Sequence, residues 1–485
     1  MKRTLALLLF ASLGGRVLAQ NNPGSSAGIT AFVGVTVIPM NVPQVLKDQV
    51  VLVRGERVAE VGAVAAVKIP ADARRIDGHG LFLMPGMADM HVHFLEKGKL
   101  GKFDTYFPLY LASGVTTVRL MGTPPDLRTV RDEINQGTRL GPTLLLTGQL
   151  IDGPPAQWGG SNVVTTPEQA RNNVDRQKRD GYDFIKVYDN LSVAAYDAVV
   201  DEAHKQHVPV VGHVPYPGGL AHVLKIPLDS IEHVEAFFIA AQRHGSPYEH
   251  VSSVPPHLGH RLFPPPKYYD DVDEARLPEL AAATAKAGSW VVPTLMMPMN
   301  VLSPQETAEA FNRPMVKYAT PYLRGWWGMG VEGVDSEGDW AAIRHGKELR
   351  LKVVRALHDA GVPLLVGTDT PHAFVVPGFA VHDEIQLLVR AGLSPFDAIA
   401  AATVNVGKFL RRPKTVGLVA PGAQADLVLL KGNPLEDVKN LSQISGVMRR
   451  GRWYPQEELQ RGLDEMAAQY AEAEHHGDAG EQGRH

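Results

Sequence analysis

Short apolar runs alternate with amphipathic stretches through the middle of the chain, from about residue 86 to 413. The stretch from Thr166 to Gly181 has helical spacing, with Thr166 as a candidate N-cap and Gly181 as the closing residue. Strand–helix alternation of this kind predicts an α/β fold, here a TIM-like (β/α)8 barrel with its chemistry at the carboxyl ends of the strands. The eight predicted strands are residues 87–93, 114–121, 141–148, 184–189, 208–214, 230–237, 289–297 and 362–369.

Both ends of the chain have a different pattern, in which short β-branched runs are broken by glycine, asparagine and proline. Runs such as ITAFVGVTVI near the start and VGLVAPGAQADLVLL near the end are typical of small antiparallel sheets. We therefore predict a composite β-sandwich domain formed by residues 27–85 and 414–456, with residues 86–413 forming the barrel. Residues 457–485 predict a helix followed by a disordered tail.

Two long segments interrupt the strand–helix alternation. Residues 245–271 are rich in proline, and residues 297–341 contain several aromatic side chains. Insertions of this length in a barrel usually serve as lids or as walls of a substrate site. Their aromatic residues could equally pack the insertions together, and the sequence leaves both interpretations open.

The first nineteen residues predict a signal peptide. Lys2 and Arg3 precede an apolar run that ends at Leu13, and Ala19 closes a stretch of small residues suited to cleavage. The apolar run is too short to span a bilayer, and the chain has no cysteine to carry a lipid anchor. The alternative is a buried first helix. We expect a periplasmic or secreted protein without a stable membrane anchor.

Composition narrows the range of chemistry. The 485 residues are 44% hydrophobic and 21% charged, which excludes a mainly disordered chain. Lys and Arg number 48 against 52 Asp and Glu, so no basic excess favours nucleic acid as a partner. The chain has no cysteine, which excludes disulfides, thiolate metal sites and a cysteine nucleophile. Any metal must therefore bind to nitrogen and oxygen ligands.

Candidate metal ligands occur on five of the predicted strands, at or near their carboxyl ends. A single histidine on an apolar strand is more often a core residue, but coincidence on five strands favours a metal site of the catalytic type. The two on the first strand lie two residues apart and point to the same side. The candidates are His91 and His93 on the first strand, Lys186 on the fourth, His213 on the fifth, His233 on the sixth and Asp369 on the eighth.

Lys186 needs a separate explanation, because an ammonium group in an apolar strand is costly unless it is paired or neutralised. Burial lowers the pKa of a lysine, and a neutral amine can react with CO₂ to form a carbamate. Such a carbamate behaves as a bidentate carboxylate and could bridge two cations. The alternative is a lysine that extends past the strand end to pair with Asp183 or Asp189.

The motifs PGMADMHVH, FIKVY, VVGHVP, DSIEHVEAF and LLVGTDT, followed by LSPFDAIAAATVN and GLVAPGAQADLVLLKGNPLED, resemble those of the amidohydrolase superfamily. Within it they are most similar to the imidazolonepropionase-like group, which includes prolidase-type dipeptidases and ochratoxin-degrading amidohydrolases. The resemblance covers nearly the whole chain after residue 19. It implies a distorted barrel with a small β-sandwich built from both termini.

The resemblance also implies a binuclear centre and a role for each ligand. Zinc is the expected ion, with manganese and iron as alternatives. A hydroxide between the two metals would attack the substrate carbonyl, and Asp369 would pass a proton to the leaving amine. Mononuclear deaminases of the superfamily lack the bridging lysine, so Lys186 favours the two-metal form. The implied ligands are His91, His93 and Asp369 for the first metal, His213 and His233 for the second, and N6-carboxylysine at Lys186 between them.

The sequence after the third predicted strand, where substrate is expected to bind, differs from the prolidase pattern. Prolidase-like members typically have Gly-Gly-His there. The corresponding residues 147–160, TGQLIDGPPAQWGG, contain no histidine, which argues against a dipeptidase without affecting the metal ligands. Tyr216, Arg119 and His372 lie near predicted strand ends and are candidate substrate-binding residues. Tyr216 could instead pack on neighbouring prolines, and Arg119 could form a structural ion pair.

The sequence therefore predicts an exported, binuclear metal-dependent amidohydrolase that hydrolyses the C–N bond of N-acyl amino acids or short peptides. A lactonase or a deaminase with the same centre is the alternative within enzymes. A non-catalytic binding protein that kept the barrel is the alternative outside them. The expected partner is a small amide or peptide rather than nucleic acid or a membrane, and a homo-oligomer is compatible with the sequence.

Overall fold

The computed structural model describes residues 28–94, 103–124, 126–249, 266–329, 334 and 336–481. The predicted signal peptide, most of the proline-rich insertion (residues 250–265) and the last four residues of the predicted tail lie outside the described residues. Within the described residues, no helix combines the length and the apolar character needed to cross a membrane.

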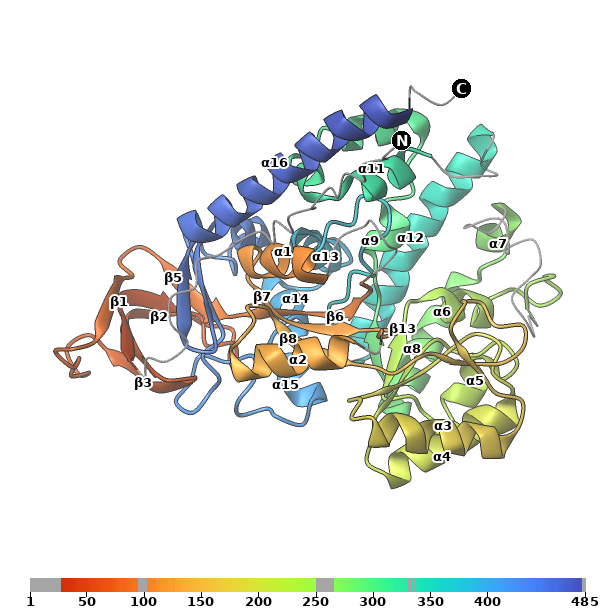
Figure 1. The fold of residues 1–485 in the computed structure, drawn as a ribbon. Helices are drawn as coiled ribbons and strands as arrows, with labels where there is room; N and C mark the ends of the chain where they lie inside the picture. The colour runs from red at the N-terminus through yellow and green to blue at the C-terminus, as the bar shows by residue number, and fades with distance from the viewer. Residues whose placement is uncertain are drawn as a thin grey trace, which may run out of the picture.

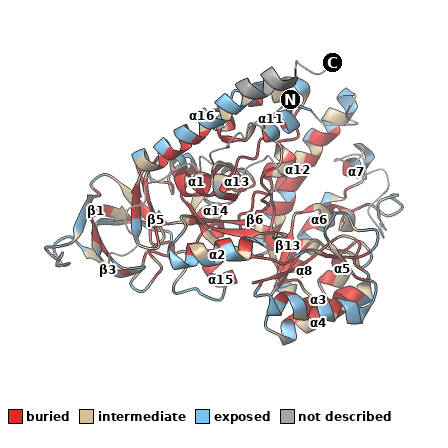
Figure 2. Ribbon diagram, viewed as in Figure 1, coloured by how far each residue is buried: buried red, intermediate tan, exposed pale blue. Residues whose placement is uncertain are grey.

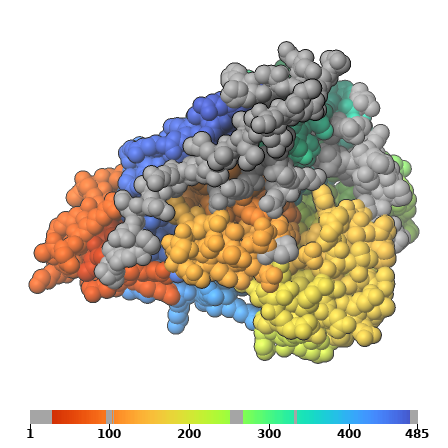
Figure 3. All heavy atoms as spheres, in the orientation of Figure 1, coloured from red at the N-terminus to blue at the C-terminus, as the bar shows by residue number. Residues whose placement is uncertain are grey.

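Strands from both ends of the chain form one eight-stranded sheet, at one end of the molecule (Figures 1 and 3). β15 from the C-terminal part pairs antiparallel with β5 from the N-terminal part, which joins the two ends. β1 pairs with β2 along one side and with both β4 and β5 along the other, so hydrogen bonding continues through β1. The strands therefore belong to a single sheet rather than to the two separate sheets of the predicted sandwich. They are β1 (Ile29–Val37), β2 (Leu46–Arg54), β3 (Arg57–Ala63), β4 (Arg74–Asp77), β5 (Phe82–Pro85), β15 (Leu427–Leu430), β16 (Ile444–Arg449) and β17 (Arg452–Pro455).

The middle of the chain forms two parallel sheets. The first has the order β6 (Met87–Val92), β7 (Val115–Leu120) and β8 (Thr143–Leu146). The second has the order β10 (Asn162–Val163), β9 (Ile151–Asp152), β11 (Ile185–Val187), β12 (Val210–Gly212), β13 (Ser230–Glu232) and β14 (Trp290–Val292). Seven of the eight predicted strands are thus present, but they form two sheets rather than one continuous barrel.

The eighth predicted strand, residues 362–369, is not a regular strand. It contributes isolated parallel bridges, from Leu364 to Val291 of β14 and from Thr370 to Val92 of β6. Asp369 has φ 56°, in the left-handed region, which interrupts an extended backbone. A third isolated bridge, Thr147 to Phe184, connects the end of β8 to the start of β11.

Helices follow most of the parallel strands, as the alternation predicts. The predicted helix after Thr166 is α3 (Pro167–Arg179), and the Thr166 hydroxyl accepts a hydrogen bond from the Gln169 N–H at 3.2 Å. Gly181, with φ 79°, follows its end. The other helices of this part are α1 (Tyr106–Ala112), α2 (Leu127–Gln136), α4 (Val193–Lys205), α5 (Gly219–Val223), α6 (Glu235–Ala240), α8 (Leu277–Ala287), α12 (Glu337–Asp359), α13 (Phe379–Arg390), α14 (Pro395–Ala401) and α15 (Val404–Phe409).

The second insertion and the C-terminus are also helical. The insertion contains α9 (Met296–Met299), α10 (Pro304–Ala310) and α11 (Pro321–Gly328), and α7 (Pro266–Asp270) ends the first insertion. The C-terminal helix α16 (Gln456–Glu481) runs along the upper edge of the molecule in Figure 1. Arg324 of α11 pairs with Glu474 of α16 at 2.8 Å, which links the second insertion to this helix.

Burial concentrates on the parallel strands and on the inner faces of the helices (Figure 2). The strands β6, β7, β11, β12 and β13 are buried at every position. Arg119 on β7 and Lys186 on β11 are among the largest fully buried side chains. Charged groups within an otherwise apolar core are costly unless they are paired or used, so these two residues mark the part of the core that carries chemistry.

Candidate metal centre

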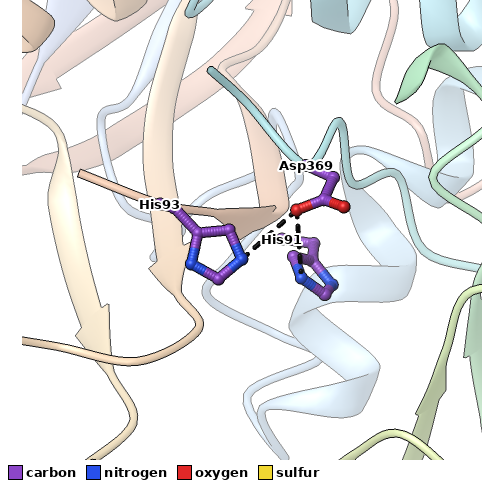
Figure 4. A group of neighbouring side chains, drawn as sticks. All are labelled: His91, His93 and Asp369. Atoms are coloured by element: carbon purple, nitrogen blue, oxygen red, sulfur yellow. Dashed lines mark ion pairs between the residues drawn. The ribbon is translucent and has the colours of Figure 1, made fainter. Parts of the chain in front are cut away.

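Two strand ends bring His91, His93 and Asp369 together. His91 belongs to β6, His93 follows its end, and Asp369 follows the irregular eighth segment. Nε2 of His93 lies 3.2 Å from Oδ1 of Asp369, and Nε2 of His91 lies 3.5 Å from the same oxygen. One ligand atom from each residue lies within 4.8 Å of the others. Figure 4 shows both rings with a nitrogen facing that carboxylate oxygen. The three predicted ligands of the first metal thus form one cluster.

His213 and His233 form a second pair beside this cluster. Their Nε2 atoms lie 3.0 Å apart. Nδ1 of His213 donates to Oδ1 of Asp189 at 2.8 Å, so its Nε2 carries a lone pair. Nδ1 of His233 lies 2.6 Å from Oγ1 of Thr294 and 4.0 Å from Oδ2 of Asp369. The Nε2 atoms of the two rings therefore lie side by side, near the carboxylate of Asp369.

The cluster holds its histidines in the neutral form that binds metals. Burial, followed by the nearby charge of Lys186, holds the pKa of His91 well below its usual value. Burial and His213 lower the pKa of His233 to about 4. Nε2 of His91 is buried and has no hydrogen-bond partner within the described residues, although such a nitrogen normally has one. A divalent cation would satisfy it, so the donor set fits a metal.

Asp369 is ionised despite its burial. Burial alone would raise the pKa of its carboxyl group, but the surrounding histidines outweigh that effect and hold the pKa well below the usual value. His372 contributes most to this lowering, and its Nε2 lies 3.6 Å from Oδ2 of Asp369. Oδ1 of Asp369 can therefore bind a metal as a negatively charged ligand beside His91 and His93. Oδ2 of Asp369 faces His372.

Lys186 lies in β11 with 1% of its surface exposed. Burial lowers the pKa of its ammonium group to about 8, against the opposing effect of Asp369 and Glu232. Among the residues that the structure describes, no carboxylate lies within ion-pair distance of Nζ. Asp183 pairs with Arg131 at 3.4 Å and Asp189 pairs with His213, so the alternative lysine partners are engaged elsewhere. Its Nζ lies over the ring of Tyr188, 5.5 Å from the centroid. The neutral form of an amine is the one that reacts with CO₂, and a lowered pKa makes that form more accessible.

Sequence reasoning missed Glu232, which precedes His233 in β13. Its Oε2 accepts a hydrogen bond from Nδ1 of His91 at 2.8 Å. Its Oε1 accepts from Nη2 of Arg119 at 2.7 Å and from Oγ of Ser230 at 2.5 Å. A carboxylate behind a ligating histidine fixes the ring and its tautomer. The signal in the sequence was an acidic residue inside the buried run SIEH.

Arg119 is fully buried behind the metal ligands. Besides Glu232, it donates to the carbonyl of Met90 at 2.6 Å and to Oγ of Ser230 at 3.0 Å. Its guanidinium lies 5.5 Å from the ring of Phe184 and 5.4 Å from the ring of Phe409. With 0% exposure and its donors bound to protein groups, Arg119 fits the alternative of a structural ion pair rather than contact with substrate.

Asp89 is a second residue that sequence reasoning missed. Its Oδ2 accepts a hydrogen bond from the Thr368 hydroxyl at 2.6 Å, and its Oδ1 accepts from the Thr368 N–H at 2.9 Å. Burial raises the pKa of its carboxyl group to about 7. These bonds join β6 to the segment that carries Asp369, so Asp89 sets the distance between the two halves of the first cluster.

The remaining predicted substrate residues lie close to the cluster. His372 contacts Asp369 and is about one-third exposed. The backbone N–H of Tyr216 donates to the carbonyl of Asp189 at 2.8 Å, which places Tyr216 next to the residue that orients His213. Burial raises the pKa of its hydroxyl group above the usual value. Their contact with substrate stays a prediction.

Two of the ligands have strained backbones. His233 has φ 67° and Asp369 has φ 56°, a region that residues with side chains rarely adopt. Each such residue costs on the order of 1–3 kcal/mol, and such strain concentrates at functional sites. The surrounding hydrogen bonds hold these residues in place, with the Asp369 N–H bound to the His91 carbonyl at 2.8 Å.

The sequence model of the amidohydrolase family matches residues 82–454, which is most of the chain and includes every ligand described above. The chain belongs to the amidohydrolase family. The resemblance inferred from the motifs is thus confirmed at the level of the superfamily.

The names of proteins similar to this chain refer to different substrates. Ochratoxinase from Aspergillus niger is 36% identical over 124 residues, which is 24% of this chain. The match covers 23% of the length of that enzyme. The solved structure of bottromycin amidohydrolase has a TM-score of 0.72 at 24% identity, covering 94% of this chain and 95% of that one. The solved structure of a Xaa-Pro dipeptidase with bound methionine has a TM-score of 0.64 at 21% identity, covering 88% of this chain and 100% of that one. The two solved structures show that the fold is shared.

We expect Glu232 to orient His91 and to stabilise the fold through Arg119, and Glu232→Gln tests this. The change removes the charge opposite Arg119, and breaking a buried ion pair typically costs about 3–5 kcal/mol. Loss of an outer carboxylate partner typically lowers metal affinity by about 10–100-fold. We expect calorimetric metal titration to show weaker binding and thermal unfolding to show a lower midpoint. Asp183→Asn, which weakens a partly exposed ion pair with Arg131, is the control. Unchanged affinity in Glu232→Gln would remove Glu232 from the metal centre.

Proposed function

We propose that the protein hydrolyses amides with a binuclear metal centre. The observation that carries the proposal is the grouping of His91, His93 and Asp369 with the neighbouring pair His213 and His233, together with a buried lysine, Lys186, that has no carboxylate partner among the described residues. Zinc is the expected ion, with manganese and iron as alternatives. In this proposal His91, His93 and Asp369 hold the first ion, His213 and His233 hold the second, and N6-carboxylysine at Lys186 lies between them.

Bound divalent ions lower the pKa of water and polarise a substrate carbonyl. The protein's own groups supply orientation and proton movement. Glu232 and Asp189 fix the rings of His91 and His213 through their Nδ1 atoms. Asp369 is ionised and can therefore accept a proton at Oδ2, the oxygen that faces His233 and His372. Hydrolysis of an amide requires a proton on the leaving amine, and Asp369 is the group placed to supply it.

For the substrate, we propose an N-acyl amino acid or a short peptide. The names of ochratoxinase, bottromycin amidohydrolase and the Xaa-Pro dipeptidase support an amide or peptide bond in the relatives. The segment 147–160 has no histidine, which argues against dipeptidase specificity.

A panel of substrates tests the reaction class. The protein reconstituted with zinc or manganese should hydrolyse N-acyl amino acids or short peptides faster than lactones or aminated heterocycles. Faster turnover of lactones or of an amine-bearing ring would support the lactonase or deaminase alternative instead. Absence of turnover together with absence of bound metal would support the non-catalytic binding protein.

The two parallel sheets support a distorted (β/α)8 barrel in this proposal. Isolated bridges connect β8 to the start of β11, β14 to Leu364, and Thr370 to β6, which gives a ring of neighbouring segments. All of the proposed ligands lie at or near the carboxyl ends of these segments, where barrel enzymes carry their active sites.

We also propose that the protein is exported. The support is the charged start, short apolar run and small residues within residues 1–19. N-terminal sequencing of the protein from the periplasm or medium should give a start near Gln20. Active cytosolic protein that retains residues 1–19 would contradict export.

A further inference from the structure

Two exposed tryptophans reach the metal centre through different residues. Trp158 is 58% exposed, and its Nε1 donates to the hydroxyl of Tyr188 at 2.6 Å. The ring of Tyr188 lies 4.0 Å from the ring of His213. Trp326, on α11, is 36% exposed, and its ring lies 6.3 Å from the ring of His372, which contacts Asp369. Each tryptophan is therefore two contacts from a metal ligand or closer.

The exposed aromatic residues of the described part of the protein lie in two segments of the chain. Every exposed aromatic side chain among the described residues lies in the loop after β9 or in the second insertion. Apolar groups that gather at the surface usually mark a binding site, whereas isolated ones are common everywhere. These aromatic residues are Trp158, Phe311, Tyr322 and Trp326.

The loop that carries Trp158 is held by hydrogen bonds rather than by burial of the ring. The carboxylate of Asp152 accepts hydrogen bonds from three backbone N–H groups, those of Gly153, Gln157 and Asn190, at 2.8, 3.0 and 2.8 Å. Together with the bond to Tyr188, they hold in place a tryptophan that stays more than half exposed. Ordering a large side chain costs conformational entropy, and here burial does not offset that cost. A preorganised face of this kind is suited to stacking against a ligand.

We propose that Trp158 and Trp326 are aromatic walls of the substrate site, and that they select amides that carry an aromatic or similarly flat apolar group. The inference rests on the proposed amide hydrolysis and adds its substrate class. Stacking on an indole favours a flat apolar group over a small one such as acetyl. Tyr188 positions Trp158 relative to His213, so the wall is fixed relative to a proposed metal ligand.

Matched substrate pairs test the walls. One pair is N-naphthoylglycine and N-acetylglycine, and the other is N-acetylphenylalanine and N-acetylalanine, so that the aromatic group lies on either side of the amide bond. The protein should prefer the aromatic member of at least one pair in kcat/KM. Trp158→Ala and Trp326→Ala should each reduce that preference by about tenfold, the scale of one lost aromatic contact. Trp158→Phe should retain most of it.

Trp340→Ala is the control, because Trp340 is half-buried on α12 and no ring contact within the described residues joins it to the site. If no amide is hydrolysed, the proposed function fails, and calorimetric binding of 2-naphthoic acid then tests the walls alone. Binding about tenfold weaker in Trp158→Ala and Trp326→Ala would support them. Equal preference and equal binding in all variants would overturn the inference. A lower oligomeric mass with unchanged preference would overturn it in favour of a contact between copies of the chain.

Discussion

Asp369→Asn should stay folded and keep at least one metal ion, yet lose turnover by about 10²–10⁴-fold, the usual effect of removing a general base. Asn keeps the shape and one oxygen ligand of Asp369. It also tolerates the left-handed backbone found there, φ 56°, so the change isolates the ionisable group. The carboxylate lies 3.2 Å from His93 and 3.6 Å from His372, and these histidines help to hold its pKa well below the usual value.

The measurement combines kcat, KM and metal content for Asp369→Asn, with Asp132→Asn as the control because Asp132 is an exposed partner of Arg131. The loss should appear in kcat much more than in KM. Turnover within a few-fold of the parent would show that Asp369 is not the proton carrier. Loss of both metals together with unfolding would show a mainly structural role and require another base.

Lys186→Ala should lose most activity and at least one metal ion. Lys186 is buried, its pKa is lowered to about 8, and no carboxylate of the described residues pairs with it, so we expect it to form the proposed carbamate. Truncation removes the proposed bridging group and leaves room for a small acid. Short carboxylic acids, or bicarbonate, should therefore restore part of both the activity and the metal content.

A second substitution separates the bridge from packing. Lys186→Met keeps the length of the side chain without the amine, and it should lose metal and activity like Lys186→Ala while remaining more stable. Lys178→Ala, on the exposed face of α3, is the control. Carbon NMR after exchange with labelled bicarbonate should show a carbamate signal in the parent and none in either Lys186 variant. Full metal occupancy and normal turnover in Lys186→Ala would refute the bridge.

The ligands could be predicted from the sequence because each strand end is a local signal. His91 and His93 share one side of a strand, and a polar residue at the end of an apolar run is visible without knowledge of the fold. The signal for the helix that begins after Thr166 is equally local, because capping of the first turn by a hydroxyl depends on only a few neighbouring residues.

The residues that support the ligands could not be predicted in the same way. Glu232 lies 141 residues from His91, and Asp89 lies 279 residues from Thr368, so their hydrogen bonds depend on which strands become neighbours. The eighth strand was overpredicted for a related reason. Its apolar run suggested regular pairing, but the backbone at Asp369 turns into the left-handed region to aim the carboxylate.

The place of Trp158 depends on a contact between loops. Its hydrogen bond to Tyr188 joins the segment after β9 to the segment after β11, and neither segment has a pattern that predicts the partner. The sequence indicated only that the Gly-Gly-His typical of prolidases is missing from residues 147–160. The structure shows what lies there: an ordered, exposed indole beside the ring that contacts His213.

Titration of the metal-free protein with zinc, with bound metal and amide hydrolysis measured on the same samples, tests the central claim most directly. The account predicts that activity is absent after chelation and that it returns as binding approaches about two ions per chain, the composition of a two-metal hydrolase. Full hydrolysis by the chelated protein, or saturation of both binding and activity at a single ion, would contradict the binuclear centre.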